Sequence, residues 1–169
     1  SGVADKGMPL GNWTSQFFAN IYLNELDQFV KHKLKAKYYI RYVDDFVILH
    51  KSKFVLEYYK NKINDFLKKL CIELHPTKCK IIPLGQGVSF LGFRVFYHYK
   101  IVRTRNLRKI KAKLTSSLSD YEAENIDIYD ILEILHGWNA YAMNGNTYHL
   151  RERLSNEIRK ELVRNTNTG

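Results

Sequence analysis

The chain has few of the features that mark secreted or membrane proteins. Its two cysteines, Cys71 and Cys79, are too few for a disulfide framework and favour a reducing compartment. It has no run of about 18 uncharged apolar residues, so we expect no membrane-spanning helix. The N-terminus lacks a basic segment followed by an apolar one, so no secretory signal is expected. These absences predict a cytoplasmic protein without a membrane partner.

Acidic residues are absent from one long stretch. No Asp or Glu occurs from Leu74 through Ser119, and ten Lys and Arg residues lie there. Elsewhere basic and acidic residues are equal in number, so the formal net charge of +10 comes from this stretch alone. Such a one-sided block suits a polyanion such as nucleic acid, because neutralised phosphates release counterions. A solvated face that only keeps the protein soluble would have the same composition.

The remaining composition is that of a globular protein. Of the 169 residues, 45% are hydrophobic and 26% are charged, which excludes disorder over the whole chain. The length suits one domain or part of one.

The N-terminal part combines helical and strand patterns. A helix is predicted from Asn12 or Thr14 to about His32, because apolar residues recur there at helical spacing. Two short aromatic and β-branched segments, residues 38–42 and 46–49, predict a β-hairpin with two acids at its tip. The buried stripe of the helix is expected to contain Phe18, Tyr22, Leu26 and Phe29.

A helix is predicted next over residues 53–70, followed by short strands. The chain then becomes helical, with apolar residues at helical spacing from Leu107, from Ile128 and from Leu150. We therefore predict an α+β fold, in which an antiparallel sheet with packed helices precedes an all-helical part. The predicted strands are residues 72–74, 80–82 and 89–96.

The acid pair at the hairpin tip has the clearest chemistry. A plain hairpin turn favours Asp-Gly or Asn-Gly, whereas this tip has Asp44 and Asp45 side by side. Adjacent carboxylates repel each other, and a hard divalent cation relieves that repulsion. Mg²⁺ binds few protein oxygens and completes its shell with substrate phosphates, so the pair favours metal-assisted phosphoryl chemistry. An Asp-rich turn without a metal is the alternative.

Four segments, in this order and spacing, resemble motifs of the reverse transcriptase family. Tyr42-Val43-Asp44-Asp45 is similar to the Tyr-x-Asp-Asp box, and residues 7–16 resemble the motif that opens the long palm helix. His75-Pro76-Thr77-Lys78 resembles the lysine-bearing motif, and Phe90-Leu91-Gly92-Phe93 resembles the primer grip. The resemblance implies the C-terminal part of a polymerase palm over residues 1–102 and thumb helices over residues 103–169.

Among bacterial retroelement enzymes, the chain is most similar to those of diversity-generating retroelements. Leu10-Gly11 followed by Thr14-Ser15-Gln16 has their form, whereas group II intron enzymes usually have Gln-Gly and Ser-Pro. Residues 137–141 and 146–151 also resemble the thumb helices of the diversity-generating type. Group II intron, retron-type and phage-defence enzymes are the alternatives.

The resemblance implies a role for each motif residue. Asp44 and Asp45 would be catalytic and hold the metal, which is Mg²⁺ or, in its place, Mn²⁺. Lys78 would be catalytic by approaching the β- and γ-phosphates and protonating the pyrophosphate; the alternative is a loop lysine in solvent. The residues implied to contact the nucleotide or primer are Gly11, Gln16, Tyr42, Leu91, Gly92 and Phe93.

The basic stretch adds candidate contacts to the nucleic-acid backbone. These candidates are Arg103, Arg105, Arg108, Lys109, Lys111 and Lys113. The aromatic residues Trp138, Tyr141 and Tyr148 would either stack on sugar or base or pack in the core, and their helical spacing favours the core.

The function that the resemblance implies is RNA-templated DNA synthesis. Its partners would be template RNA, a DNA or RNA primer and dNTPs, with a small basic accessory protein in the diversity-generating type. The third carboxylate of the family lies on a strand before the motif at residues 7–16, and Asp5 is too close to that motif to be it. We therefore expect the chain to be the C-terminal part of a longer polymerase and to be inactive alone.

Two other functions are alternatives, although the second would not be expected to combine the motifs at residues 10–16 and 90–93. The first is a non-catalytic nucleic-acid-binding module that retains the palm fold. The second is a different two-metal enzyme, such as a nuclease or an RNA-templated RNA polymerase.

Overall fold

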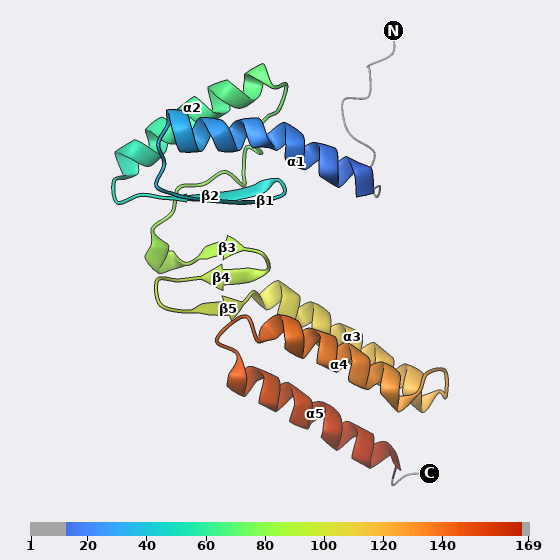
Figure 1. The fold of residues 1–169 in the computed structure, drawn as a ribbon. Helices are drawn as coiled ribbons and strands as arrows, with labels where there is room; N and C mark the ends of the chain where they lie inside the picture. Colours follow the sequence, from blue (N-terminus) through green and yellow to red (C-terminus); the bar gives the residue numbers. More distant parts are fainter. Residues whose placement is uncertain (1–12, 167–169) are drawn as a thin grey trace. The chain divides into compact units, whose positions relative to one another are not determined.

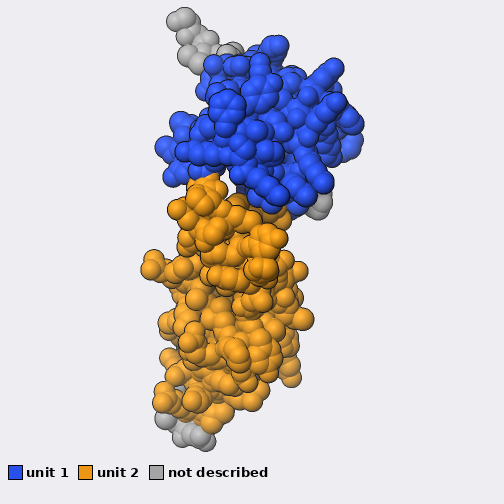
Figure 2. All heavy atoms as spheres, turned by 90° about the vertical axis from the view of Figure 1, so that its left-hand side faces the viewer, with its two compact units in different colours: residues 1–81 blue, residues 82–169 orange. Residues whose placement is uncertain are grey.

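A computed structural model of the chain describes residues 13–166. Contacts between residues divide the chain into two compact units, Ser1–Ile81 (unit 1) and Ile82–Gly169 (unit 2), which Figure 2 distinguishes by colour. Each unit contains its own cluster of buried hydrophobic residues. No helix in the described part of the chain is long and apolar enough to cross a membrane.

Unit 1 consists of a β-hairpin with two helices packed on one face (Figure 1). Helix α1 (Trp13–Gln28) continues into a π-helical turn, η1 (Phe29–Lys33). Strands β1 (Tyr38–Tyr42) and β2 (Asp45–Leu49) pair antiparallel, and helix α2 (Lys53–Lys69) follows them. The predicted hairpin and the helix predicted over residues 53–70 are thereby confirmed.

The hairpin has one covered face and one open face, because successive side chains of a strand point to opposite sides. Tyr39, Phe46 and Ile48 pack against the core of unit 1, which contains Leu26 of α1 and Ile63 of α2. The side chains on the other face are exposed or only partly buried. The exposed hydrophobic residues on this open face are Tyr38, Ile40, Tyr42 and Leu49.

The predicted buried stripe of α1 is wrong in its N-terminal half. Leu26 is 1% exposed, whereas Phe18 and Tyr22 are 57% and 47% exposed. The helical spacing of these residues is as expected, but the N-terminal half of α1, which includes Phe18, extends beyond the hairpin (Figure 1). Tyr22 lies in the other half, where its hydroxyl donates to the Leu70 carbonyl at 2.6 Å. Periodicity identifies the apolar face of a helix but not how far the rest of the unit covers it.

Two predicted strands, residues 72–74 and 80–82, are also wrong, because the chain is irregular there. Ile72 and Leu74 are partly buried against the core of unit 1, which explains their apolar pattern without strand pairing. Between the two segments, the carbonyl of His75 accepts hydrogen bonds from the N–H groups of Lys78 and Cys79 at 3.3 and 3.2 Å. The chain therefore turns at His75 and does not continue in an extended direction.

Unit 2 begins with a 3-10 turn, η2 (Leu84–Gln86), and a three-stranded antiparallel sheet. The strands are β3 (Val88–Phe90), β4 (Phe93–Val95) and β5 (Lys100–Val102). The single strand predicted over residues 89–96 is wrong, because Leu91 and Gly92 have φ angles of 48° and 82° and reverse the chain between β3 and β4. Strand β5 was not predicted.

Three helices complete unit 2, and all three coincide with helical segments predicted from the sequence. They are α3 (Thr104–Glu122), α4 (Ile128–Ala142) and α5 (Tyr148–Thr166). Their buried residues join Phe93 and Val102 of the sheet in one core, so β3–β5 belong to the same compact unit as the helices. The predicted division after residue 102 marks the start of the helical part, and its assignment as a palm–thumb boundary stays a prediction.

Candidate active site and nucleic-acid interface

The turn between β1 and β2 places Asp44 and Asp45 at the tip of the hairpin. Tyr42 pairs with Asp45, so Val43 and Asp44 form a two-residue turn. Val43 has a φ of 54°, in the left-handed region where glycine or asparagine is usual and a β-branched residue is rare. A residue in this conformation costs about 1–3 kcal/mol and persists only where the surrounding structure holds it there.

Both carboxylates are exposed. Asp45 lies opposite Tyr42 in the pairing, and the strand alternation places the two side chains together on the open face of the hairpin. Tyr42 is 59% exposed on this face. Within the described residues, neither Asp44 nor Asp45 forms a salt bridge with a basic side chain. Within residues 13–166, no basic side chain therefore competes with a cation for these two acids.

This donor set fits Mg²⁺, which takes oxygen ligands and is commonly bound through one or two carboxylates and substrate phosphates. Residues 13–166 contain no group of three or more His, Cys, Asp or Glu side chains that would form a metal site by itself. Asp44 and Asp45 alone would therefore supply only part of a Mg²⁺ coordination shell.

A polar network on the covered face joins the hairpin to α1 at Arg41. The Nε and Nη2 of Arg41 donate to the two carboxylate oxygens of Asp27 at 2.9 and 2.7 Å. Its Nη1 donates to Asn20 Oδ1 at 3.1 Å and to the carbonyl oxygen of Val43 at 2.7 Å. The hydroxyl of Tyr39 donates to Asp27 Oδ1 at 2.6 Å. The network thus extends from α1 to the backbone of the β1–β2 turn.

These contacts shift the pKa values of the three titratable groups. Hydrogen bonds from Arg41 hold the pKa of Asp27 below its usual 3.8, against a smaller opposing effect of burial. Burial, with a smaller contribution from the hydrogen bond to Asp27, raises the pKa of Tyr39. The Asp27 carboxylate raises the pKa of Arg41. At neutral pH the pair is ionised and Tyr39 keeps its proton.

Arg41 and Asp27 were not identified as functional residues from the sequence. One signal was present, because Asn20, Asn24 and Asp27 form a polar line on a helix that otherwise has an apolar face. Arg41 also occupies a strand position whose neighbours on the same face, Tyr39 and Phe46, are apolar. A basic residue on a covered sheet face indicates an acidic partner on the helix that covers it.

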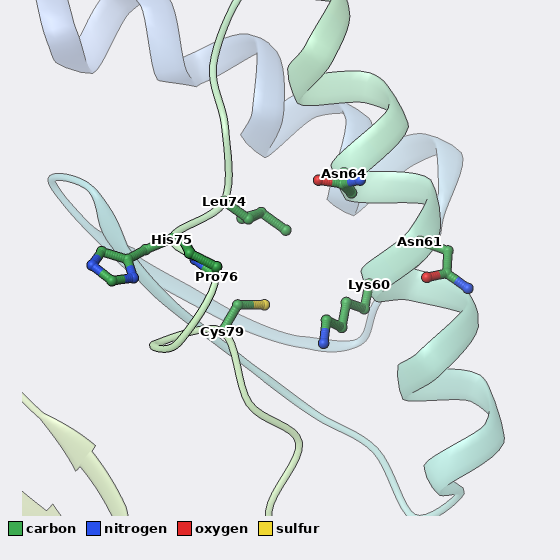
Figure 3. A pocket seen from close by; sticks show the side chains of 7 residues that line it. All are labelled: Lys60, Asn61, Asn64, Leu74, His75, Pro76 and Cys79. Carbon is green, nitrogen blue, oxygen red and sulfur yellow. The ribbon is translucent and has the colours of Figure 1, made fainter.

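Lys78 lies in the turn that begins at His75, and its side chain is exposed. No hydrogen bond or salt bridge of the described residues joins Lys78 to Asp44 or Asp45. A pocket of about 180 Å³ lies beside this turn (Figure 3), and Lys78 is not among its lining residues. The pocket is lined by Lys60, Asn61, Asn64, Leu74, His75, Pro76 and Cys79. The catalytic role of Lys78 therefore stays a prediction.

The Leu91–Gly92 turn lies in unit 2 and is tied to the helices there. The Gly92 carbonyl accepts hydrogen bonds from the Arg103 N–H at 3.1 Å and from Asn106 Nδ2 at 3.3 Å. A Cβ atom on Gly92 would collide with the hydroxyl of Tyr141, so no larger residue fits at this φ of 82°. Phe93 is 7% exposed in the core, whereas Leu91 is 45% exposed at the turn.

Two of the predicted nucleotide contacts are not described structurally. Gly11 lies outside the described residues. Gln16 lies in α1, but its side chain is outside the described set.

The six predicted backbone-binding residues are all exposed at or along α3. The helix buries Ile110 and Leu114 in the core of unit 2, which turns Arg105, Lys109 and Lys113 toward solvent at intervals of one turn. Of the six, Lys111 forms a salt bridge, because its Nζ lies 3.3 Å from Glu157 Oε2. No salt bridge of the described part engages the other five. Three of them, Arg105, Lys109 and Lys113, form a basic row along the exposed face of α3.

The three C-terminal aromatic residues have different environments. Trp138 is 8% exposed in the core of unit 2, and Tyr141 packs against that core with its ring centroid 4.9 Å from Phe93. Tyr148 is 65% exposed at the start of α5. Core packing thus explains the first two but not Tyr148.

The chain was compared with known protein families. A family model described as reverse transcriptase (RNA-dependent DNA polymerase) matches residues 3–95. No curated protein matches the chain. The matched range contains the hairpin with Asp44 and Asp45, the turn with Lys78 and the turn with Gly92, and it ends before α3.

Proposed function

The chain belongs to the reverse transcriptase family, and on this basis we propose that it contributes the acid pair for RNA-templated DNA synthesis in a retroelement polymerase. The observation that carries this proposal is the pair of exposed carboxylates at the β1–β2 turn, which have no basic partner within the described residues. The proposed substrates are a template RNA, a DNA or RNA primer and dNTPs.

The reaction is an in-line displacement at phosphorus. The primer 3′-oxygen forms a bond to the α-phosphorus of the dNTP, the bond to the bridging oxygen breaks, and pyrophosphate leaves. When bound, Mg²⁺ supplies charge that favours the deprotonated 3′-oxygen and stabilises the leaving oxygen. Asp44 and Asp45 would hold that metal, and Lys78 would supply a proton to the pyrophosphate.

Other residues would hold the substrates in place. Tyr42, on the same face as Asp45, offers an exposed ring to the sugar or base at the primer end. The turn at Leu91 and Gly92, with Phe93 anchored in the core, would hold the primer strand. The exposed basic row of α3 would contact phosphates of the duplex without reading its sequence.

Two finer assignments are part of this proposal. The Leu10-Gly11 and Thr14-Ser15-Gln16 segments favour an enzyme of the diversity-generating retroelement type, with a small basic accessory protein as a further partner. The resemblance to the family implies a third carboxylate besides Asp44 and Asp45, and we assign it to a further segment of the same polymerase. The 169-residue chain is then expected to be inactive in isolation.

The test is primer extension on an RNA template with dNTPs, using the polymerase that carries this chain. Asp44→Asn removes a metal-binding charge and should reduce the extension rate by at least about a hundredfold, which corresponds to about 2.7 kcal/mol. RNA binding and the circular dichroism spectrum should stay unchanged. Asp65→Asn, at an exposed position on α2, makes the same chemical change away from the turn and should extend normally.

Equal activity of Asp44→Asn and the unmodified enzyme would contradict the proposed role of the turn. A folded enzyme that binds RNA but does not extend a primer, even unmodified, would favour the alternative of a non-catalytic nucleic-acid-binding module. Incorporation of rNTPs in place of dNTPs would identify an RNA-templated RNA polymerase.

A further inference from the structure

The backbone of the catalytic turn needs a stabilising contact. Val43 is a β-branched residue with a φ of 54°, a conformation that strains its side chain against its own backbone. The hairpin has only two residues, Val43 and Asp44, between its last paired positions. Without a further contact, the turn would sample other conformations, and Asp44 would change direction with it.

Arg41 supplies that contact. Its Nη1 donates a hydrogen bond of 2.7 Å to the carbonyl oxygen of Val43, a short distance typical of charge-assisted bonds. The carbonyl of Val43 and the N–H of Asp44 belong to one planar peptide unit. A hydrogen bond that fixes this oxygen therefore also fixes the orientation of the peptide plane that leads into Asp44.

The guanidinium group is itself held in one orientation. Its Nε and Nη2 form a two-pronged pair with Asp27, and the Arg41 side chain is only 11% exposed. Asp27 is held in turn by the hydroxyl of Tyr39 at 2.6 Å. Because a guanidinium is planar and rigid, the fork to Asp27 determines the direction in which Nη1 points. Asp27 on α1 therefore determines, through Arg41, where the hydrogen bond to the Val43 carbonyl forms.

We propose that Arg41 is a positioning residue, which, through the Val43 carbonyl, holds Asp44 in the direction needed to bind the metal. Asp27 on α1 is its anchor. Arg41 does not touch substrate or metal in this role, and it acts only through the turn. The inference rests on the proposed function, because it assigns Arg41 to the same acid pair.

The test measures metal binding directly, with Mn²⁺ as the probe and electron paramagnetic resonance as the readout of free Mn²⁺. Arg41→Lys keeps the positive charge but cannot bond to Asp27 and to Val43 in one plane. Residues that orient metal ligands typically change metal affinity or activity by about 10–100-fold when substituted. We expect Arg41→Lys to weaken Mn²⁺ binding by at least about tenfold, and Asp27→Asn to weaken it to a smaller degree.

Two control variants separate positioning from loss of stability. Asn20→Ala removes a partner of the same Nη1 but leaves the bonds to Val43 and Asp27, so it should bind Mn²⁺ normally. Ile63→Val trims the core of unit 1 away from the turn, and it should lower the melting temperature without changing Mn²⁺ affinity. In the polymerase, Arg41→Lys should lower kcat and leave the KM for primer–template unchanged.

Unchanged Mn²⁺ affinity in Arg41→Lys, with only a lower melting temperature, would overturn the inference and leave Arg41 a structural residue. If Arg41→Lys does not fold, Asp27→Asn decides, and its unchanged Mn²⁺ affinity would have the same meaning. A different result would contradict the proposed function itself. The unmodified protein and Asp44→Asn would then bind Mn²⁺ with equal affinity, whatever the Arg41 variants do.

Discussion

At the scale of single residues, the candidate site depends on one ion pair and one carbonyl group. Asp27 on α1 fixes the Arg41 guanidinium, which donates to the Val43 carbonyl at the turn. Asp44 and Asp45 at the same turn have no such partner within the described residues. The residues that hold the turn are thus shielded beneath the hairpin, and those that would bind the metal are open to solvent.

The Asp27–Arg41 pair should make stability depend on pH. The pKa of Asp27 is lowered from 3.8 in the folded protein, so its stabilising effect is present above that value and is lost as the pH falls through the lower folded pKa. Asp27→Asn should lower the free energy of unfolding at neutral pH by about 1–3 kcal/mol, and the difference should shrink below about pH 4.

Urea denaturation at a series of pH values measures this difference. Asp65→Asn, which breaks no salt bridge of the described residues, serves as the control and should behave like the unmodified protein at each pH. A difference between Asp27→Asn and the unmodified protein that stays constant down to about pH 3 would contradict the assigned charge on Asp27.

Some residues of the candidate site can be identified from the sequence, whereas others can be identified only from the fold. Asp44 and Asp45 are recognisable because adjacent acids within a strand pattern are chemically unusual. Arg41 and Asp27 are 14 positions apart, and only the packing of α1 on the hairpin brings them together. Local patterns contain no direct information about such a contact.

At the scale of elements, regular hydrophobic periodicity predicted the helices and the hairpin correctly, whereas short apolar runs did not predict strands correctly. The hairpin, α2 and the three helices of unit 2 have repeating patterns several turns or residues long, and each was predicted. Ile72 and Leu74 are apolar because they pack against the core of unit 1, and a residue can do so from an irregular segment as well as from a strand. The strand predicted over residues 89–96 continued through the reversal at Leu91–Gly92, because a single glycine within an apolar run gives a weak turn signal.

The basic row on α3 should contribute to affinity through phosphates. Replacing Arg105, Lys109 and Lys113 with Gln should weaken binding of an RNA–DNA duplex. It should also reduce the slope of log K against log salt by about 0.7–0.9 for each phosphate that the variant no longer neutralises. Fluorescence anisotropy between low and physiological salt measures both quantities.

A charge-matched control is available on α5. Gln in place of the exposed residues Arg153, Arg159 and Lys160 removes the same charge from the same unit. The α5 variant should keep most of the salt slope, because the proposal assigns the phosphate contacts to α3. Equal reductions in the two triple variants would show that net charge, and not the row on α3, determines binding.

At the scale of the whole molecule, the family match and the compact units divide the chain differently. The match ends at residue 95, within the strands of unit 2, whereas the units divide after Ile81. The strands β3–β5 share a core with α3–α5, so part of the reverse transcriptase domain folds together with helices outside the matched range. Sequence motifs follow the chemistry of a site, and compact units follow hydrophobic contacts, so the two need not coincide.

For the molecule as a whole, the central claim is that the β1–β2 turn binds its divalent metal. The most direct measurement is an anomalous difference map from crystals of the protein grown with Mn²⁺ and a nucleotide. We expect the strongest peak to lie within coordination distance of the Asp44 and Asp45 carboxylates, with phosphate oxygens completing the shell. A map with no peak at the turn, and with both carboxylates bound to basic side chains, would contradict this claim.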